Sequence, residues 1–149
     1  MLSTIPATTT RVNENTAEHV NQRIEDETAM RVRRFAALGR AAIDRRLDEL
    51  DHEWDIERVL EANAATATFV GTVLGARDRR WLLLPAAVGV FLLQHAVQGW
   101  CPPMIWFRRM GIRTATEIDH ERYALKALRG DFRHVEPQSP SDALAAARA

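Results

Sequence analysis

The chain has 149 residues, with 20 lysine and arginine residues balanced by 20 aspartate and glutamate residues. The length suits one domain, and a net charge of zero argues against a nucleic-acid-binding protein that relies on a basic face. A single cysteine excludes an internal disulfide and a cysteine-rich zinc site, so a secreted, disulfide-stabilised fold is excluded as well.

The N-terminal part of the chain is polar and then highly charged. We expect residues 1–14 to be disordered. They lack the basic segment and apolar core of a signal peptide, so we expect them to stay on the cytoplasmic side. Residues 15–55 predict an amphipathic, charged helical arm. An apolar stripe in this arm suits a partner helix or a membrane surface and consists of Ile43, Leu47, Leu50 and Trp54.

Two stretches carry almost no charge, residues 59–76 and 81–101. They are about 18 and 21 residues long, close to the roughly 20 that cross a bilayer. The nine Leu, Val and Phe residues of the second stretch favour insertion by about 3 to 5 kcal/mol. The first stretch has six such residues and contains Glu61, so alone it would insert only marginally. The pattern predicts an all-α protein with an antiparallel two-helix transmembrane hairpin over residues 56–113.

The tryptophans and small residues favour the membrane over a soluble helical bundle. Indole rings collect at membrane interfaces. The four tryptophans lie at the ends of the apolar stretches or just beyond them, and we interpret them as interface anchors: Trp54, Trp81, Trp100 and Trp106. Small residues that would let the two helices pack closely in lipid repeat every four positions at Ala67, Gly71 and Gly75. A soluble all-helical interaction module remains an alternative.

Two ionisable residues lie inside the predicted spans. If the helices turn back at residues 77–80, Glu61 and His95 lie at similar depth and could hydrogen-bond across the hairpin. An ionisable group inside a membrane is a functional candidate. Both residues, however, lie within two turns of the interface, where a partner or a water molecule suffices, so we favour a structural role for the pair.

A further helix is predicted after the hairpin. A capping-box pattern at Thr114 and Glu117 opens a C-terminal amphipathic helix over residues 114–130 that stops at Gly130. Residues 131–149, which contain two prolines, predict a flexible tail.

Two Glu-x-x-His pairs have the spacing found in di-iron carboxylate proteins, Glu49 with His52 and Glu117 with His120. Helical wheels place them away from the apolar faces, whereas metal ligands in a helical bundle point inward, so we expect no metal site. The sequence contains no phosphate-binding loop and no Ser-His-Asp set. We therefore expect no cofactor and no catalytic residue.

The single cysteine, Cys101, stands between Trp100 and two prolines. Proline cannot continue a helix, so the second span should end at Cys101, with the thiol at the depth of the interface. The partly apolar surroundings favour a structural cysteine over a reactive one.

The segment Gly99-Trp100-Cys101-Pro102, followed by Met110-Gly111-Ile112, resembles the YgaP-like inner-membrane domain family. These are small bacterial two-helix proteins whose second helix closes in a Gly-x-Cys-Pro motif. Glu57-Arg58 fits the pattern too, but the gap between Cys101 and Gly111 is longer than in the family. Some members are fused to a rhodanese domain, which carries sulfur on a cysteine persulfide. The resemblance implies a membrane hairpin and, as an alternative role, sulfur handling or thiol redox chemistry at Cys101.

The function that these patterns favour is a non-enzymatic, structural or accessory role in the bacterial inner membrane. We expect the lipid bilayer to surround the hairpin and both termini to be cytoplasmic. Because two helices bury little surface alone, we expect a homodimer or a subunit of a membrane complex, with no nucleic-acid partner.

Overall fold

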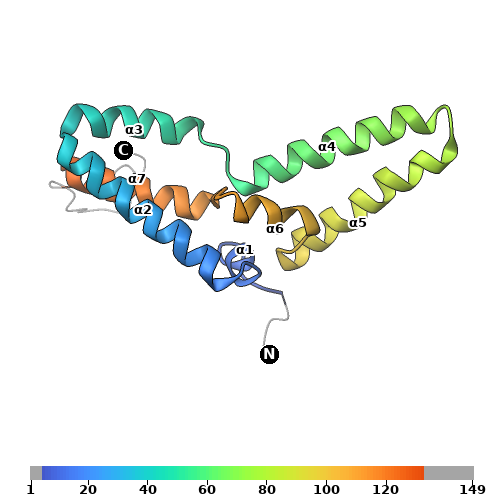
Figure 1. Ribbon diagram of the computed structural model, residues 1–149, viewed down its shortest axis with the longest axis horizontal. Coiled ribbons are helices and arrows are strands. Elements are labelled where there is room, and N and C mark those ends of the chain that lie inside the picture. The colour runs from blue at the N-terminus through green and yellow to red at the C-terminus, as the bar shows by residue number, and fades with distance from the viewer. Residues whose placement is uncertain (1–4, 133–149) are drawn as a thin grey trace, which may run out of the picture. The chain divides into compact units, whose positions relative to one another are not determined.

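The computed structural model describes residues 5–132, and every regular element in this range is a helix, as the sequence predicts (Figure 1). The chain forms two compact units. We call Met1–Glu25 with Trp54–Thr116 the hairpin unit, and Asp26–Glu53 with Glu117–Ala149 the arm unit. The disorder predicted for the first four residues and the flexible tail predicted beyond Phe132 lie outside the described residues.

The hairpin unit is built on two antiparallel helices, α4 (Ile56–Gly75) and α5 (Leu83–Gln98), which are joined by a turn and the short 3₁₀-helix η1 (Arg79–Leu82). Helix α4 begins where the Asp55 carboxylate accepts a hydrogen bond of 2.8 Å from the backbone N–H of Arg58. This side chain satisfies one of the donors that the first turn of a helix leaves free.

One continuous segment, Arg79–Gln98, is long and apolar enough to cross a membrane, and it is the one such helix in residues 5–132. Only 6% of its most apolar window is buried inside the protein, unlike the core helix of a soluble fold. Helix α4 does not reach the same combination of length and hydropathy. A second membrane-spanning helix over residues 59–76 is therefore not confirmed.

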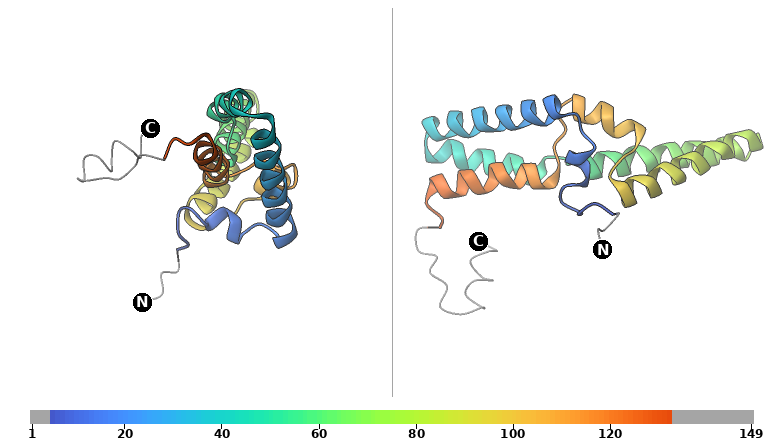
Figure 2. Two further views of the ribbon diagram at one scale, coloured as in Figure 1. Left: turned by 90° about the vertical axis from the view of Figure 1, so that its left-hand side faces the viewer. Right: turned by 90° about the horizontal axis from the view of Figure 1, so that it is seen from below.

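Close packing of α4 and α5 is confined to the end of the hairpin near the turn. The two helices lie closest there and diverge towards their other ends (Figures 1 and 2). Gly71 and Gly75 are buried in the close part. A Cβ atom on Gly71 would lie 2.6 Å from Cδ of Pro85, and one on Gly75 would overlap the Leu82 side chain. The absence of side chains at these glycines therefore permits the approach.

The diverging ends of the hairpin are closed by two short helices, α1 (Arg11–Glu14) and α6 (Pro102–Arg109). Residues 11–14 fall in the segment predicted to be disordered, so the structure corrects that prediction here. We call this end of the hairpin unit the base. Its apolar core consists of Val12, Ile56, Leu60, Cys101 and Met104.

The second span ends slightly earlier than predicted. Helix α5 ends at Gln98, because Gly99 takes a left-handed conformation with φ of 76° and closes the helix. Pro102 then occupies the first turn of α6, where a missing N–H is tolerated. Gly99 thus ends α5 and Pro102 begins α6, which has no counterpart among the predicted elements.

The arm unit contains α3 (Arg40–His52), most of α2 (Glu18–Leu38) and most of α7 (Ala115–Arg129). Gly39, with φ of 84°, separates α2 from α3 and divides the predicted arm into two helices. Helix α7 ends at Arg129, and Gly130 follows with φ of 93°, as the sequence predicts.

The apolar stripe of α3 packs against α7 within the arm unit, so its partner helix belongs to the same chain. The core consists of Ile43, Leu47, Leu50, Ile118 and Leu125. Glu121 is fully buried beside this core and accepts hydrogen bonds from Nε of Arg31 (3.1 Å) and Nε of Arg46 (2.8 Å). Two guanidinium groups therefore compensate one buried carboxylate.

Candidate functional site

The polar groups at the base of the hairpin form a connected chain. His95 of α5 is 4% exposed, and its Nε2 lies 2.8 Å from Oε2 of Glu57 on α4. The other oxygen of Glu57 accepts a hydrogen bond of 2.9 Å from Nη2 of Arg11 on α1. The hydrogen bond from His95 and the neighbouring Arg11 hold the pKa of Glu57 below its ordinary value, so this carboxylate is ionised at neutral pH.

The partner of His95 differs from the predicted one. Glu61 is exposed, and the hydrogen bond goes to Glu57, one helical turn nearer the base. Part of the difference comes from η1, because a 3₁₀-helix rises more per residue than an α-helix, so the returning chain reaches a given depth in fewer residues. Glu57 lies on the same polar stripe of α4 as Glu61, so the sequence does contain a signal for it. Nothing in the sequence points to Arg11.

Cys101 lies in the base core, 4% exposed, at the N-cap position of α6. Its thiol is close enough to the His95 ring to interact with it. Nδ1 of His95 is buried and makes no hydrogen bond of normal geometry within residues 5–132. The base therefore gathers a thiol, an imidazole and a carboxylate from three different parts of the hairpin unit.

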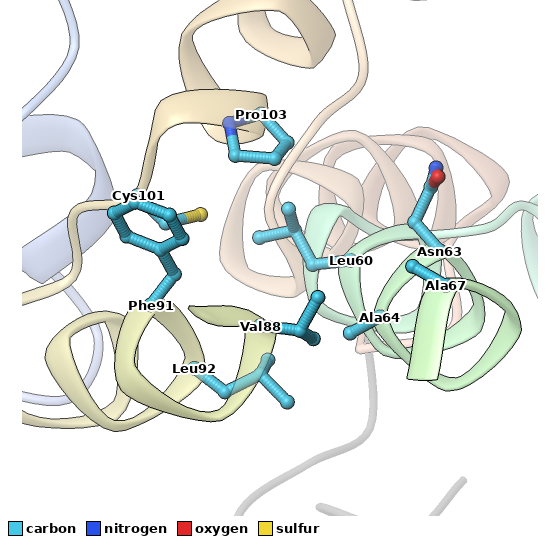
Figure 3. A pocket seen from close by; sticks show the side chains of 9 residues that line it. All are labelled: Leu60, Asn63, Ala64, Ala67, Val88, Phe91, Leu92, Cys101 and Pro103. Atoms are coloured by element: carbon cyan, nitrogen blue, oxygen red, sulfur yellow. The ribbon is translucent and has the colours of Figure 1, made fainter. Parts of the chain in front are cut away.

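A cavity of about 120 Å³ lies between α4 and α5, where the two helices diverge (Figure 3). Cys101 and Pro103 line one end of it, and Asn63 is the one polar amide on its wall. The rest of the lining is aliphatic or aromatic and consists of Leu60, Ala64, Ala67, Val88, Phe91 and Leu92. Ala67, predicted as a helix-packing residue, thus borders this cavity, whereas Gly71 and Gly75 lie in the close contact.

The four tryptophans differ in their surroundings. Trp54 is about half exposed and stacks under the guanidinium of Arg58, 4.4 Å from the ring centroid. Trp81 and Trp106 are also exposed, whereas Trp100 packs against the base core. Their role as anchors at the lipid interface stays a prediction.

The Glu-x-x-His pairs do not converge on a metal site. Glu49 accepts a hydrogen bond of 3.0 Å from Arg46, and Nδ1 of His52 lies 2.9 Å from the backbone oxygen of Asp48. In the part of the chain that the structure describes, no group of three His, Cys, Asp or Glu side chains could hold a metal ion.

Residues 55–117 match the family model described as "Inner membrane protein YgaP-like, transmembrane domain". The match begins at the residue that caps α4 and extends past α6 into the first turn of α7, so it includes the hairpin, the Gly-x-Cys-Pro segment and the α6 part of the base, whereas α1 lies outside it. No curated protein and no solved structure matches the chain significantly.

The exposed apolar helix Arg79–Gln98 agrees with this match, because a transmembrane domain implies a lipid bilayer around it. Residues 55–117 of this membrane protein therefore belong to the YgaP-like transmembrane domain family of inner-membrane proteins.

Proposed function

We propose that the chain is a non-enzymatic accessory protein of the bacterial inner membrane, in which the hairpin anchors a helical arm to the membrane. The observation that carries this proposal is the apolar surface of α5, which is almost uncovered by the rest of the protein within a segment that matches a transmembrane family. Lipid is the solvent that fits such a surface.

The proposal includes α4 as the second membrane-spanning helix. Phe69, Val70 and Val73 of α4 are exposed apolar residues, and Gly71 holds the helix against α5. A weakly apolar helix can enter the bilayer together with a strongly apolar partner, because the pair buries polar groups between them. Both termini then lie on the same side, which we propose is the cytoplasmic side.

Reporter fusions test this topology. A cytoplasm-active reporter should be active at the C-terminus and inactive when it is inserted between Arg77 and Asp78 in the turn. A periplasm-active reporter should give the opposite result. Equal activity of one reporter at both places would contradict the two-span arrangement.

We further propose that the protein acts through a partner, as a homodimer or as a subunit of a membrane complex. The support is indirect: two helices bury little surface, and much of the apolar surface of the hairpin is free to pack against other helices. Light scattering of the detergent-solubilised protein, with the mass of bound detergent subtracted, separates a monomer from a dimer. A monomer at every concentration would leave only the complex-subunit form of the proposal, which cross-linking in intact membranes tests.

The second candidate is a thiol function at Cys101, which is favoured by the neighbouring His95 and Glu57. Alkylation kinetics separate the two candidates. A thiol that reacts no faster than a model peptide near neutral pH would favour the purely structural role.

A further inference from the structure

Cys101, His95 and Glu57 are arranged in space as a nucleophile, a base next to it and a carboxylate that orients the base. Nε2 of His95 is engaged by the Glu57 carboxylate, which accepts its proton in a hydrogen bond of 2.8 Å. When the ring is neutral, the proton on Nε2 leaves the lone pair on Nδ1. That nitrogen is buried and unpartnered within the described residues, and the thiol is the other group with which the ring interacts.

The thiol lies at one end of the apolar cavity between α4 and α5. Leu60, Ala64 and Ala67 lie on one face of α4 and span about 10 Å along the helix. Leu92 and Val88 face them from α5 in the antiparallel direction, and Cys101 stands at the Leu60 end (Figure 3). The cavity therefore runs from the thiol along the hairpin towards the turn.

We propose that Cys101 is an S-acylation site that accepts a fatty-acyl group from an acyl thioester, with the first carbons of the acyl chain lying in the cavity between α4 and α5 and the rest of the chain extending towards the bilayer. A linear hydrocarbon fits both the apolar lining and the direction of the cavity, which follows the hairpin into the bilayer. Cysteines next to a membrane-spanning helix are also a common type of acylation site.

The reaction is a thioester exchange and needs no oxidant or reductant. His95 Nδ1 takes the thiol proton, and Sγ of Cys101 forms a bond with the acyl carbonyl carbon. The bond between that carbon and the sulfur of the donor breaks, and the donor leaves as a thiolate that receives the proton from His95. Glu57 is a positioning residue, because it holds the ring and stabilises its protonated form without touching the acyl group.

The test uses the full chain in lipid nanodiscs with palmitoyl-coenzyme A as the donor. Intact mass spectrometry should show the addition of one palmitoyl group that hydroxylamine removes, and Cys101→Ser should show none. His95→Gln should slow acylation about 100-fold at neutral pH, and its rate should approach the wild-type rate at high pH, where the thiolate forms without a base. The other titratable groups at this site are Glu57 of α4 and Arg11 of α1.

A matched pair of variants tests the cavity. Ala67→Phe should fill it and slow palmitoyl transfer while leaving transfer from acetyl-coenzyme A unchanged. Ala87→Phe adds the same ring at an exposed position of α5 outside the cavity and should change neither rate. Circular dichroism and thiol titration in denaturant confirm that each variant is folded and carries its thiol.

Three outcomes would overturn the proposal: an adduct that persists in Cys101→Ser, no adduct on the folded wild-type protein, or equal effects of Ala67→Phe and Ala87→Phe on palmitoyl transfer. If His95→Gln does not fold, the comparison of Ala67→Phe with Ala87→Phe still tests the proposal. The proposal rests on the membrane location proposed above. Failure to enter nanodiscs would count against that location, whereas a nanodisc-bound protein without an adduct would count against acylation alone.

Discussion

Replacing Gly71 with alanine should weaken the hairpin. The new Cβ would lie 2.6 Å from Cδ of Pro85 and 3.2 Å from Cβ of Leu84. Because the proline ring is rigid, α4 and α5 must separate. Overpacking of this kind costs about 1 to 3 kcal/mol, and the higher helix propensity of alanine returns up to about 1 kcal/mol. We expect a net loss of about 1 to 2 kcal/mol in the free energy of unfolding.

Gly89→Ala is the matched control, because a Cβ at Gly89 meets nothing within 4 Å. It should leave stability unchanged or raise it by up to about 1 kcal/mol. The assay is unfolding in mixed micelles of dodecyl maltoside and sodium dodecyl sulfate, followed by circular dichroism. Pro85→Ala should relieve much of the cost of Gly71→Ala in a double-mutant cycle. Equal effects of Gly71→Ala and Gly89→Ala would refute the close contact near the turn.

Two further substitutions, each with a matched control, and one pH dependence test the base, all in the same unfolding assay. Glu57→Gln should lower the free energy of unfolding by about 1 to 2 kcal/mol, allowing for the partial exposure of the carboxylate, whereas Glu61→Gln should change it hardly at all. Equal losses for the two variants would contradict the pairing of Glu57 with His95. Because folding lowers the pKa of Glu57, the contribution of this carboxylate to the free energy of unfolding is complete at neutral pH. The contribution is lost as the pH falls below the ordinary value of 4.5 and through the folded pKa. The stabilities of Glu57→Gln and the wild type should therefore converge in acid. Gly99→Ala and Gly111→Ala both introduce a side chain at a positive φ, which costs about 1 to 2 kcal/mol each. Of the two, Gly99→Ala also places a Cβ 2.5 Å from the backbone oxygen of Arg11 and should lose more stability. A smaller loss of stability for Gly99→Ala than for Gly111→Ala would argue against the docking of α1 on the base.

The helices and their ends were largely predictable from the sequence. Apolar stretches, the glycine after α7 and the double proline after α5 act locally, so their effects can be read without knowing the fold. The break at Gly39 and the short α6 were not predicted. A proline pair is compatible with a loop or with the first turn of a new helix, and the choice depends on Met104, which α6 buries in the base core.

The candidate site was only partly predictable, because its contacts are long-range. His95 and Cys101 could be selected individually as a buried ionisable group and a single thiol. Their relation to Glu57 depends on how far the chain advances in η1, and the contact with Arg11 depends on how α1 docks. The cavity results from the divergence of two helices, and no sequence period encodes that angle.

Lipid contact of the hairpin is the central claim, and spin-label accessibility tests it most directly. In a Cys101→Ser background, single cysteines at Phe69 of α4 and Val90 of α5 replace side chains that are 70% and 63% exposed. In lipid nanodiscs, both labels should collide frequently with oxygen, which concentrates in the bilayer, and rarely with a water-soluble nickel complex. Strong collisions with the nickel complex at both positions would contradict the account.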